Sequence, residues 1–138
     1  MPVLFFSTVN DCASQGLEAL VQATVWPDQL EICCSVKALY QRLRRPRGNL
    51  RIAVFNVSSE KELRIIVSLK DLLDDLETIL ILPDVTMRNA VKAHEIRPRF
   101  LVHATSDWNP VTVAAVLAKI LKKHETQLNQ KGDTKNER

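Results

Sequence analysis

Five short apolar runs, each followed by a segment with helical periodicity, constrain this sequence more than any other feature. The runs cover residues 3–6, 30–34, 52–55, 78–82 and 100–103. A continuous apolar run is typical of a strand that is covered on both faces. Strands that alternate with helices indicate a parallel sheet with right-handed crossovers. We therefore expect an α/β fold, a (βα)5 three-layer sandwich with the flavodoxin-like strand order 2-1-3-4-5.

Start and stop signals place helices between the expected strands. Ser35 is the expected N-cap of a helix that runs through Arg44. Ser59 and Glu62 have the spacing of a capping box, in which each side chain bonds the backbone N–H of the other residue. Asn109 is the expected cap of the last helix. The expected helices cover residues 13–25, 36–44, 60–76, 86–95 and 110–124.

Length and composition favour one domain of ordinary globular type. The chain has 138 residues, of which 46% are hydrophobic and 25% are charged. After residue 124 only Leu128 is large and apolar, so we predict a domain over residues 1–124 and a disordered tail over 125–138. No apolar run has the length of a membrane span, so no membrane association is expected. The odd number of cysteines argues against a disulfide framework and favours a cytoplasmic location.

Functional residues of a doubly wound sheet gather where the carboxyl ends of the strands meet, near the switch between the first and third strands. In this sequence Ser7 and Thr8 lie at the end of the first strand, and Asn56 follows the third. Pro83 follows the fourth strand, and His103 ends the fifth. None of these five side chains carries a carboxylate.

In size, element order and strand-end positions, residues 2–123 resemble a response-regulator receiver domain of the CheY-like type. The resemblance implies a signalling role in which an aspartate that ends the third strand accepts a phosphoryl group. It also implies an acidic pair for Mg²⁺ after the first strand, a Ser or Thr after the fourth and a lysine after the fifth. The matching positions here hold Ser7 with Thr8, Asn56, Pro83 and His103.

These departures bear directly on phosphoryl chemistry. The acceptor must be a carboxylate, and the amide of Asn56 has neither its charge nor its basicity. Carboxylates must also hold the divalent cation, whereas Ser7 and Thr8 offer neutral oxygens. His103 is a weaker, pH-dependent substitute for lysine. We predict a pseudo-receiver of two-component type: a non-enzymatic interaction module with no catalytic residue, metal or cofactor.

Two strand-end features have alternative interpretations. Asn56 is either an uncharged mimic that fixes one signalling conformation or a polar residue that bonds neighbouring loops, and the second interpretation is favoured. Asp11 and Asp84 would have to rebuild a cation site from displaced positions, and Asp84 more simply starts a turn or caps a helix. A metal site is therefore not predicted.

Cys12 supports the main alternative, a small flavodoxin-like enzyme or phosphocarrier. It follows the first strand and faces a helix N-terminus, which lowers a thiol pKa and binds phosphate. The tyrosine-phosphatase pattern needs an arginine six residues later, where Glu18 stands. A flavin site would use the same loop, residues 7–10, but only Trp108 is available to stack on the flavin ring.

An arginine-rich segment covers the end of the second expected helix and the residues after it. Without interleaved aromatic residues or a DNA-binding motif, we do not expect nucleic-acid binding and interpret the segment as a solvated helix end. Its members are Arg42, Arg44, Arg45, Arg47 and Arg51.

The last helix has a wider apolar stripe than one sheet-facing surface requires. Val111, Ala115 and Ala118 belong to this stripe and form the expected partner surface. The partner is expected to be another protein or a second copy of this chain. The alternative is that the alanines serve only as good helix formers.

Overall fold

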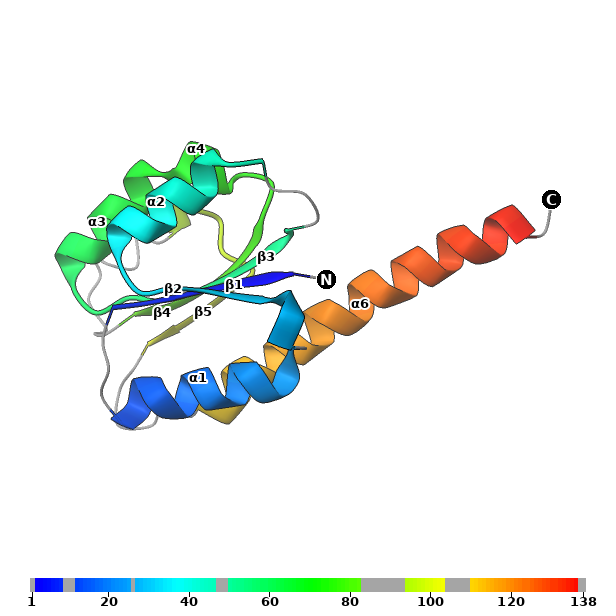
Figure 1. The fold of residues 1–138 in the computed structure, drawn as a ribbon, viewed down its shortest axis with the longest axis horizontal. Helices are drawn as coiled ribbons and strands as arrows, with labels where there is room; N and C mark the ends of the chain where they lie inside the picture. The colour runs from blue at the N-terminus through cyan, green and yellow to red at the C-terminus, as the bar shows by residue number, and fades with distance from the viewer. Residues whose placement is uncertain are drawn as a thin grey trace.

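The protein is described by a computed structural model that covers residues 2–8, 12–25, 27–46, 50–82, 94–103 and 110–136, with the backbone alone for 12–14, 27, 103 and 124–136. Five parallel strands form one sheet in the order β2-β1-β3-β4-β5. Helices cover both faces of the sheet (Figure 1). The predicted three-layer fold and strand order are confirmed.

The elements follow the expected order along the chain. The strands are β1 (Val3–Ser7), β2 (Leu30–Cys33), β3 (Ile52–Asn56), β4 (Glu77–Leu82) and β5 (Phe100–His103). The helices are α1 (Cys12–Thr24), α2 (Val36–Arg44), α3 (Glu60–Ser68), α4 (Lys70–Leu73) and α6 (Pro110–Asn136), with a 3-10 turn at Pro27–Gln29. Most of the helix expected over 86–95 lies outside the described residues.

The prediction of a single helix over residues 60–76 is wrong, because the structure divides this segment at Leu69 into α3 and α4. The backbone of Leu69 leaves the helical region, with φ −96° and ψ 10°. Its N–H bonds the carbonyl of Ile66 at 3.0 Å, and its own carbonyl accepts from Leu72 at 2.8 Å. These tighter three-residue turns redirect the chain into α4.

The side chains of β1 show how one strand supplies two hydrophobic layers. Val3 and Phe5 pack with α1 and α6, whereas Leu4 and Phe6 pack with α2, α3 and α4. All four are at most 1% exposed. Burying each side chain contributes about 1.5–3 kcal/mol, so the central strand is stabilised from both faces.

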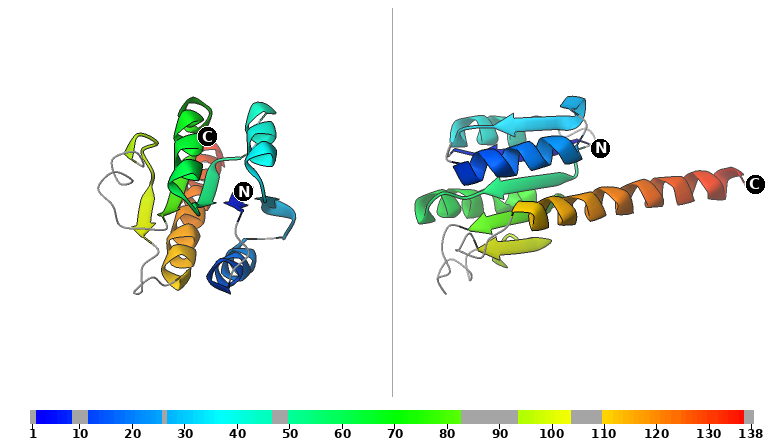
Figure 2. Two further views of the ribbon diagram at one scale, coloured as in Figure 1. Left: turned by 90° about the vertical axis from the view of Figure 1, so that its left-hand side faces the viewer. Right: turned by 90° about the horizontal axis from the view of Figure 1, so that it is seen from below.

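Helix α6 packs on the sheet through its first half, where Val113, Leu117 and Ile120 are buried. Its second half continues to Asn136 and projects beyond the sheet (Figures 1 and 2), whereas the sequence predicts a disordered tail from residue 125. A packed helix extends at low cost once nucleated, and the Glu, Gln and Lys residues here favour the helix. No helix in the described ranges has the length and apolar character of a membrane span.

The domain boundary after residue 124 stays a prediction. We expect a chain that ends at His124 to keep the melting temperature of the full chain within about 2 °C, because the α6 side chains described as buried, Val113, Leu117 and Ile120, are all kept. A chain that ends at Lys119 also loses Ile120, which is 4% exposed. That chain should lose about 2 kcal/mol of unfolding free energy in denaturant titrations. Equal losses in both chains would place the boundary beyond residue 124.

A buried hydroxyl in β4 gives a second prediction. Thr78 is fully buried, and its Oγ1 has no hydrogen-bond partner among the described residues. Thr78→Val removes this polar atom with little change of shape, so we expect about 1 kcal/mol of stabilisation in urea unfolding. Thr78→Ser keeps the hydroxyl and loses a buried methyl group, so it should destabilise by a similar amount. A clearly destabilised valine variant would contradict the prediction.

Candidate functional site

The carboxyl ends of the strands meet along one edge of the sheet. Strand register places Ser7 beside Asn56, and Asn56 beside Ile81. One position further along, Leu82 of β4 pairs with His103 of β5. The structure therefore brings Ser7 and Asn56 together, while β4 separates His103 from them.

Asn56 uses its amide to join β3 to β1. Its Nδ2 donates to Ser7 Oγ at 3.1 Å, and the residue is only 9% exposed. In the next position, Val57 donates its backbone N–H to the Ile81 carbonyl at 2.9 Å, which continues the pairing with β4. Asn56 thus has the local geometry of a strand-end residue that bonds neighbouring segments.

A carboxylate reaches this edge from the first turn of α3. Glu62 is 8% exposed, and its Oε2 accepts from Thr8 Oγ1 at 2.7 Å and from Ser58 Oγ at 2.7 Å. Its Oε1 accepts from the backbone N–H of Ser58 at 3.1 Å. One side chain therefore joins the end of β1 to the segment between β3 and α3.

This role of Glu62 differs from the capping box that the sequence predicts. Half of that box forms, since Ser59 Oγ accepts from the Glu62 backbone N–H at 3.2 Å. The carboxylate bonds Ser58, one residue before the cap, where the expected partner is Ser59. The hydroxyls of Thr8 and Ser58 lie within reach, so the carboxylate accepts three hydrogen bonds here, where the capping box would give it one. The sequence signal for this contact was the presence of two hydroxyl side chains, Thr8 after the first strand and Ser58 after the third.

Several predicted positions lack a described environment. Pro83, Asp11 and Asp84 lie outside the described residues, and His103 is described by its backbone alone. The expected cap of the last helix also falls outside. Within the described part of the chain, no group of three or more His, Cys, Asp or Glu residues could hold a metal ion.

Most of the described side chains at this edge are uncharged. Ser7, Thr8 and Asn56 are uncharged, and the first two would have to replace carboxylates as Mg²⁺ ligands. Glu62 is charged, but three donors from Thr8 and Ser58 already occupy its two oxygens. The arrangement can hold two segments together, and it presents no free carboxylate among these residues.

Cys33 and Cys34 occupy different environments, whereas Cys12 is described by its backbone alone. Cys12 is the first residue of α1. Cys33 is buried, and burial raises the pKa of its thiol, with a further increase from the nearby Glu31 carboxylate. Cys34 is exposed just beyond the end of β2, so the strand is one residue shorter than the expected range 30–34.

The expected partner stripe of α6 is open in the structure. Val111 is 56% exposed, and Ala115 and Ala118 are also exposed. On the opposite side of the helix, Val113 and Leu117 are buried against the sheet. The helix therefore has apolar side chains on two sides, of which one packs in the core.

Similar solved structures are receiver domains and pilus-assembly proteins. A CheY-like receiver domain from Methanospirillum hungatei JF-1 has a TM-score of 0.66 at 12% identity and covers 91% of this chain and 97% of its own. A receiver protein from Pseudoalteromonas atlantica has a TM-score of 0.67 at 12% identity, with coverage of 89% and 99%.

A pilus-assembly-related protein from Burkholderia pseudomallei K96243 has a TM-score of 0.60 at 19% identity and covers 92% of this chain and 90% of its own. No family model and no curated protein sequence matches the chain significantly. At these identities the likeness establishes the receiver fold and leaves function to the residues of this chain.

Replacing Glu62 tests whether its hydrogen bonds hold this edge closed. Glu62→Gln keeps the shape but removes the charge and one acceptor oxygen, so we expect a loss of about 1–3 kcal/mol in unfolding free energy. Glu60→Gln removes the same charge from the same helical turn and should cost less than about 1 kcal/mol. Both values come from urea titrations. Equal losses would contradict a particular contribution from the bonds of Glu62 to Thr8 and Ser58.

Proposed function

We propose that this chain is a receiver-like signalling module that acts through protein contact and without aspartyl phosphorylation. The hydrogen bonds that close the strand-end edge carry the proposal. Asn56 occupies the acceptor position and donates to Ser7, while Glu62 joins Thr8 to Ser58. The side chains around the acceptor position thus bond one another.

The chemistry of these groups supports a non-enzymatic role. An amide cannot act as the carboxylate nucleophile, and neutral oxygens bind Mg²⁺ weakly. A mechanism based on phosphoryl transfer needs both features together. The proposed module has no catalytic residue, cofactor or metal, and we place it in the cytoplasm.

The proposed contact surface is the α6 stripe of Val111, Ala115 and Ala118. These residues recur at spacings of four and three positions, so they share one side of the helix. Exposed apolar side chains at this spacing fit a helix or a flat apolar surface of a partner. A second copy of the chain is one such partner. The molecular mass of an Ala115→Glu variant in sedimentation equilibrium, compared with that of the natural chain, would test this pairing.

Exposure to a small phosphodonor tests the absence of phosphorylation. After incubation with acetyl phosphate and Mg²⁺, the intact mass of the full chain should be unchanged. Asn56→Asp restores only the acceptor and should also remain unmodified, because Ser7 and Thr8 supply no carboxylate for the cation. An active receiver domain serves as the positive control. Stoichiometric gain of a phosphoryl group by the natural chain would contradict the proposal.

Thiol reactivity tests the alternative carrier function. Its structural support is the place of Cys12 as the first residue of α1, where a helix N-terminus favours a thiolate. We expect Cys34 to react first with an aromatic disulfide reagent at neutral pH, because it is exposed. Cys33 should react only on unfolding, because it is buried with a raised pKa. Peptide mass mapping assigns the sites, and a Cys12 that reacts much faster than Cys34 would favour the carrier.

A further inference from the structure

One edge of the sheet combines an open strand with a basic, partly apolar groove. β2 pairs with β1 and is the outermost strand on that side of the sheet order. Figure 2 shows β2 and β5 at opposite edges of the sheet. A groove of about 1050 Å³ lies along this edge, between β2 and α2. It is separate from the strand-end edge and from the α6 stripe.

Both elements that line the groove carry an exposed apolar side chain. Ile32 of β2 is 39% exposed and Tyr40 of α2 is 42% exposed, and together with Val111 they are the most exposed large apolar residues in the described chain. The guanidinium carbon of Arg44 lies 5.4 Å from the centre of the Tyr40 ring. Tyr40 therefore presents an aromatic surface with a cation above it.

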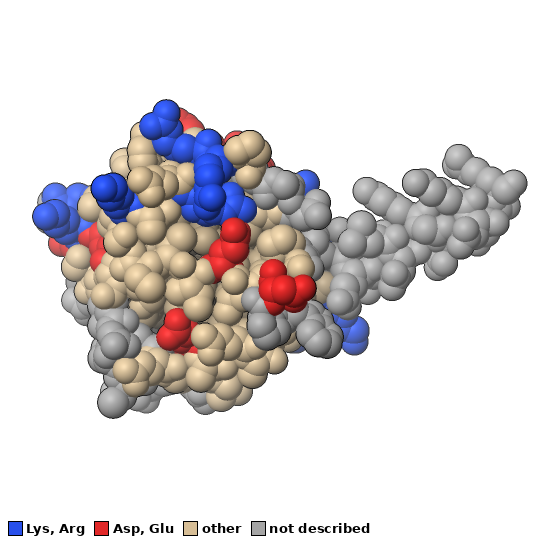
Figure 3. All heavy atoms as spheres, in the orientation of Figure 1, with Lys and Arg blue, Asp and Glu red and all other residues tan. Residues whose placement is uncertain are grey.

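The charge of the groove is strongly positive. Four cations and one carboxylate line it. Lys37 and Arg44 are exposed on α2, and Arg45 is exposed at its C-cap. Figure 3 shows Lys and Arg side chains gathered over the upper part of the visible face, beside an uncharged surface.

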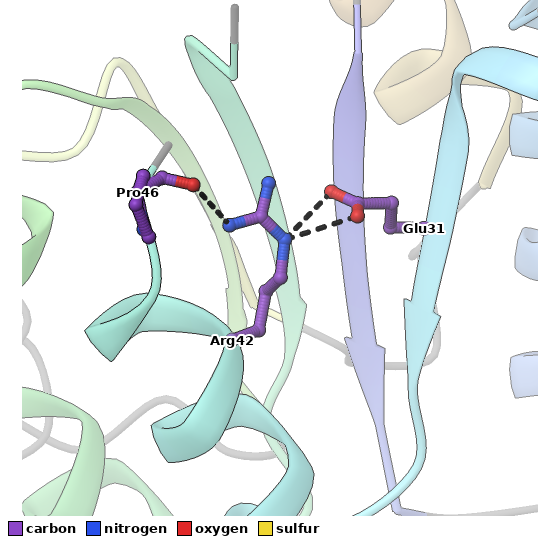
Figure 4. Close-up of polar contacts among 3 residues, drawn as sticks. All are labelled: Glu31, Arg42 and Pro46. Atoms are coloured by element: carbon purple, nitrogen blue, oxygen red, sulfur yellow. Dashed lines mark hydrogen bonds and ion pairs between the residues drawn. The ribbon is translucent and has the colours of Figure 1, made fainter. Parts of the chain in front are cut away.

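The single carboxylate is already neutralised by the fourth cation. Arg42 Nε donates to both oxygens of Glu31, at 3.0 and 2.9 Å, and Arg42 Nη1 donates to the Pro46 carbonyl at 3.5 Å (Figure 4). Arg42 is 9% exposed, which corrects its expected place at a solvated helix end. This ion pair fixes β2 against α2 and leaves Lys37, Arg44 and Arg45 as the exposed charges of the groove.

We infer that this groove binds an extended acidic segment of a partner protein, which adds to the sheet as a strand beside β2. An outermost strand presents backbone N–H and C=O groups that an extended peptide can pair with. This deepens the proposed role in protein contact and rests on it, at a surface distinct from α6. A nucleic acid would also meet the cations, but it lacks the peptide backbone that pairs with a strand.

The pleat of β2 predicts the pattern of the bound segment. Cys33 packs in the α2 layer and Leu30 packs in the α1 layer. Because side chains alternate along a strand, Glu31 faces the α2 side of the sheet and Ile32 faces the α1 side. In an added strand, side chains on the α2 side would meet Lys37, Arg44 and Arg45. Those on the other side would extend the apolar surface of Ile32. The expected ligand alternates acidic and apolar residues over about four to six positions, which matches the length of β2.

Fluorescence polarisation with labelled peptides tests this assignment on the full chain. A peptide of three Glu–Val repeats should bind saturably, and a three-repeat Lys–Val peptide should not. A peptide with the same composition in two blocks, Glu first and Val second, should bind about tenfold more weakly. The Glu–Val peptide has two alternating sets of backbone nitrogens, and methylation of one set should abolish binding, because the N–H groups of that set pair with β2 while the side-chain charge is kept. Undiminished binding of both methylated peptides would overturn the strand model.

Matched charge reversals locate the binding surface. Arg44→Glu with Arg45→Glu should weaken binding of the Glu–Val peptide by at least about tenfold. Lys119→Glu with Lys122→Glu makes the same change in net charge at exposed positions of α6 and should leave the affinity unchanged. Thermal unfolding checks that both variants fold.

Three further outcomes separate this inference from its alternatives. A single-stranded oligonucleotide that binds more tightly than the Glu–Val peptide, and loses affinity in the Arg44 and Arg45 variant, would assign the groove to nucleic acid and overturn the proposal. If no peptide binds, the groove is rejected as a peptide-binding site, and the proposed phosphorylation-independent role is unaffected. Peptide binding by a chain that acetyl phosphate modifies would support the groove while rejecting that role.

Discussion

The parallel pairing of β1 with β3 is the constraint on which the rest of the structure depends. It places two buried strands side by side with the same direction, so that Ser7 and Asn56 end in one row. Parallel strands require helical crossovers, and these crossovers supply both outer layers. They also bring the first turn of α3 to the row, which is how Glu62 comes within 2.7 Å of Thr8, 54 residues away in sequence. The closed strand-end edge therefore follows from the topology.

The sequence predicted the fold because its strongest signals are local and mutually consistent. Continuous apolar runs gave the strands, and the caps at Ser35 and Ser59 formed as expected, with Ser35 Oγ accepting from Ala38 at 3.1 Å. The break at Leu69 was missed because no Gly or Pro marks it. The partners of the Glu62 carboxylate were not predicted. They are three donors, of which the N–H and hydroxyl of Ser58 are near in sequence and the hydroxyl of Thr8 is 54 residues away.

The candidate site was predictable in position but only partly in character. The strand-end residues could be listed from element order, since the carboxyl ends of parallel strands meet at one edge. Whether Asn56 bonds Ser7 depends on strand register, which a run of apolar residues leaves undetermined. The β2–α2 groove was predictable only as an arginine-rich segment. Its apolar part requires the fold, because Ile32 and Tyr40 come from different elements.

The ion pair between Glu31 and Arg42 has a consequence for the motions of this edge. β2 pairs with one neighbouring strand, so it is held less firmly than β1, which has two. The pair couples the strand to α2, and the buried Arg42 would lose its carboxylate partner if β2 detached alone. Strand and helix should therefore open as one cooperative unit of local unfolding, and their amide protons should exchange with the same free energy of opening.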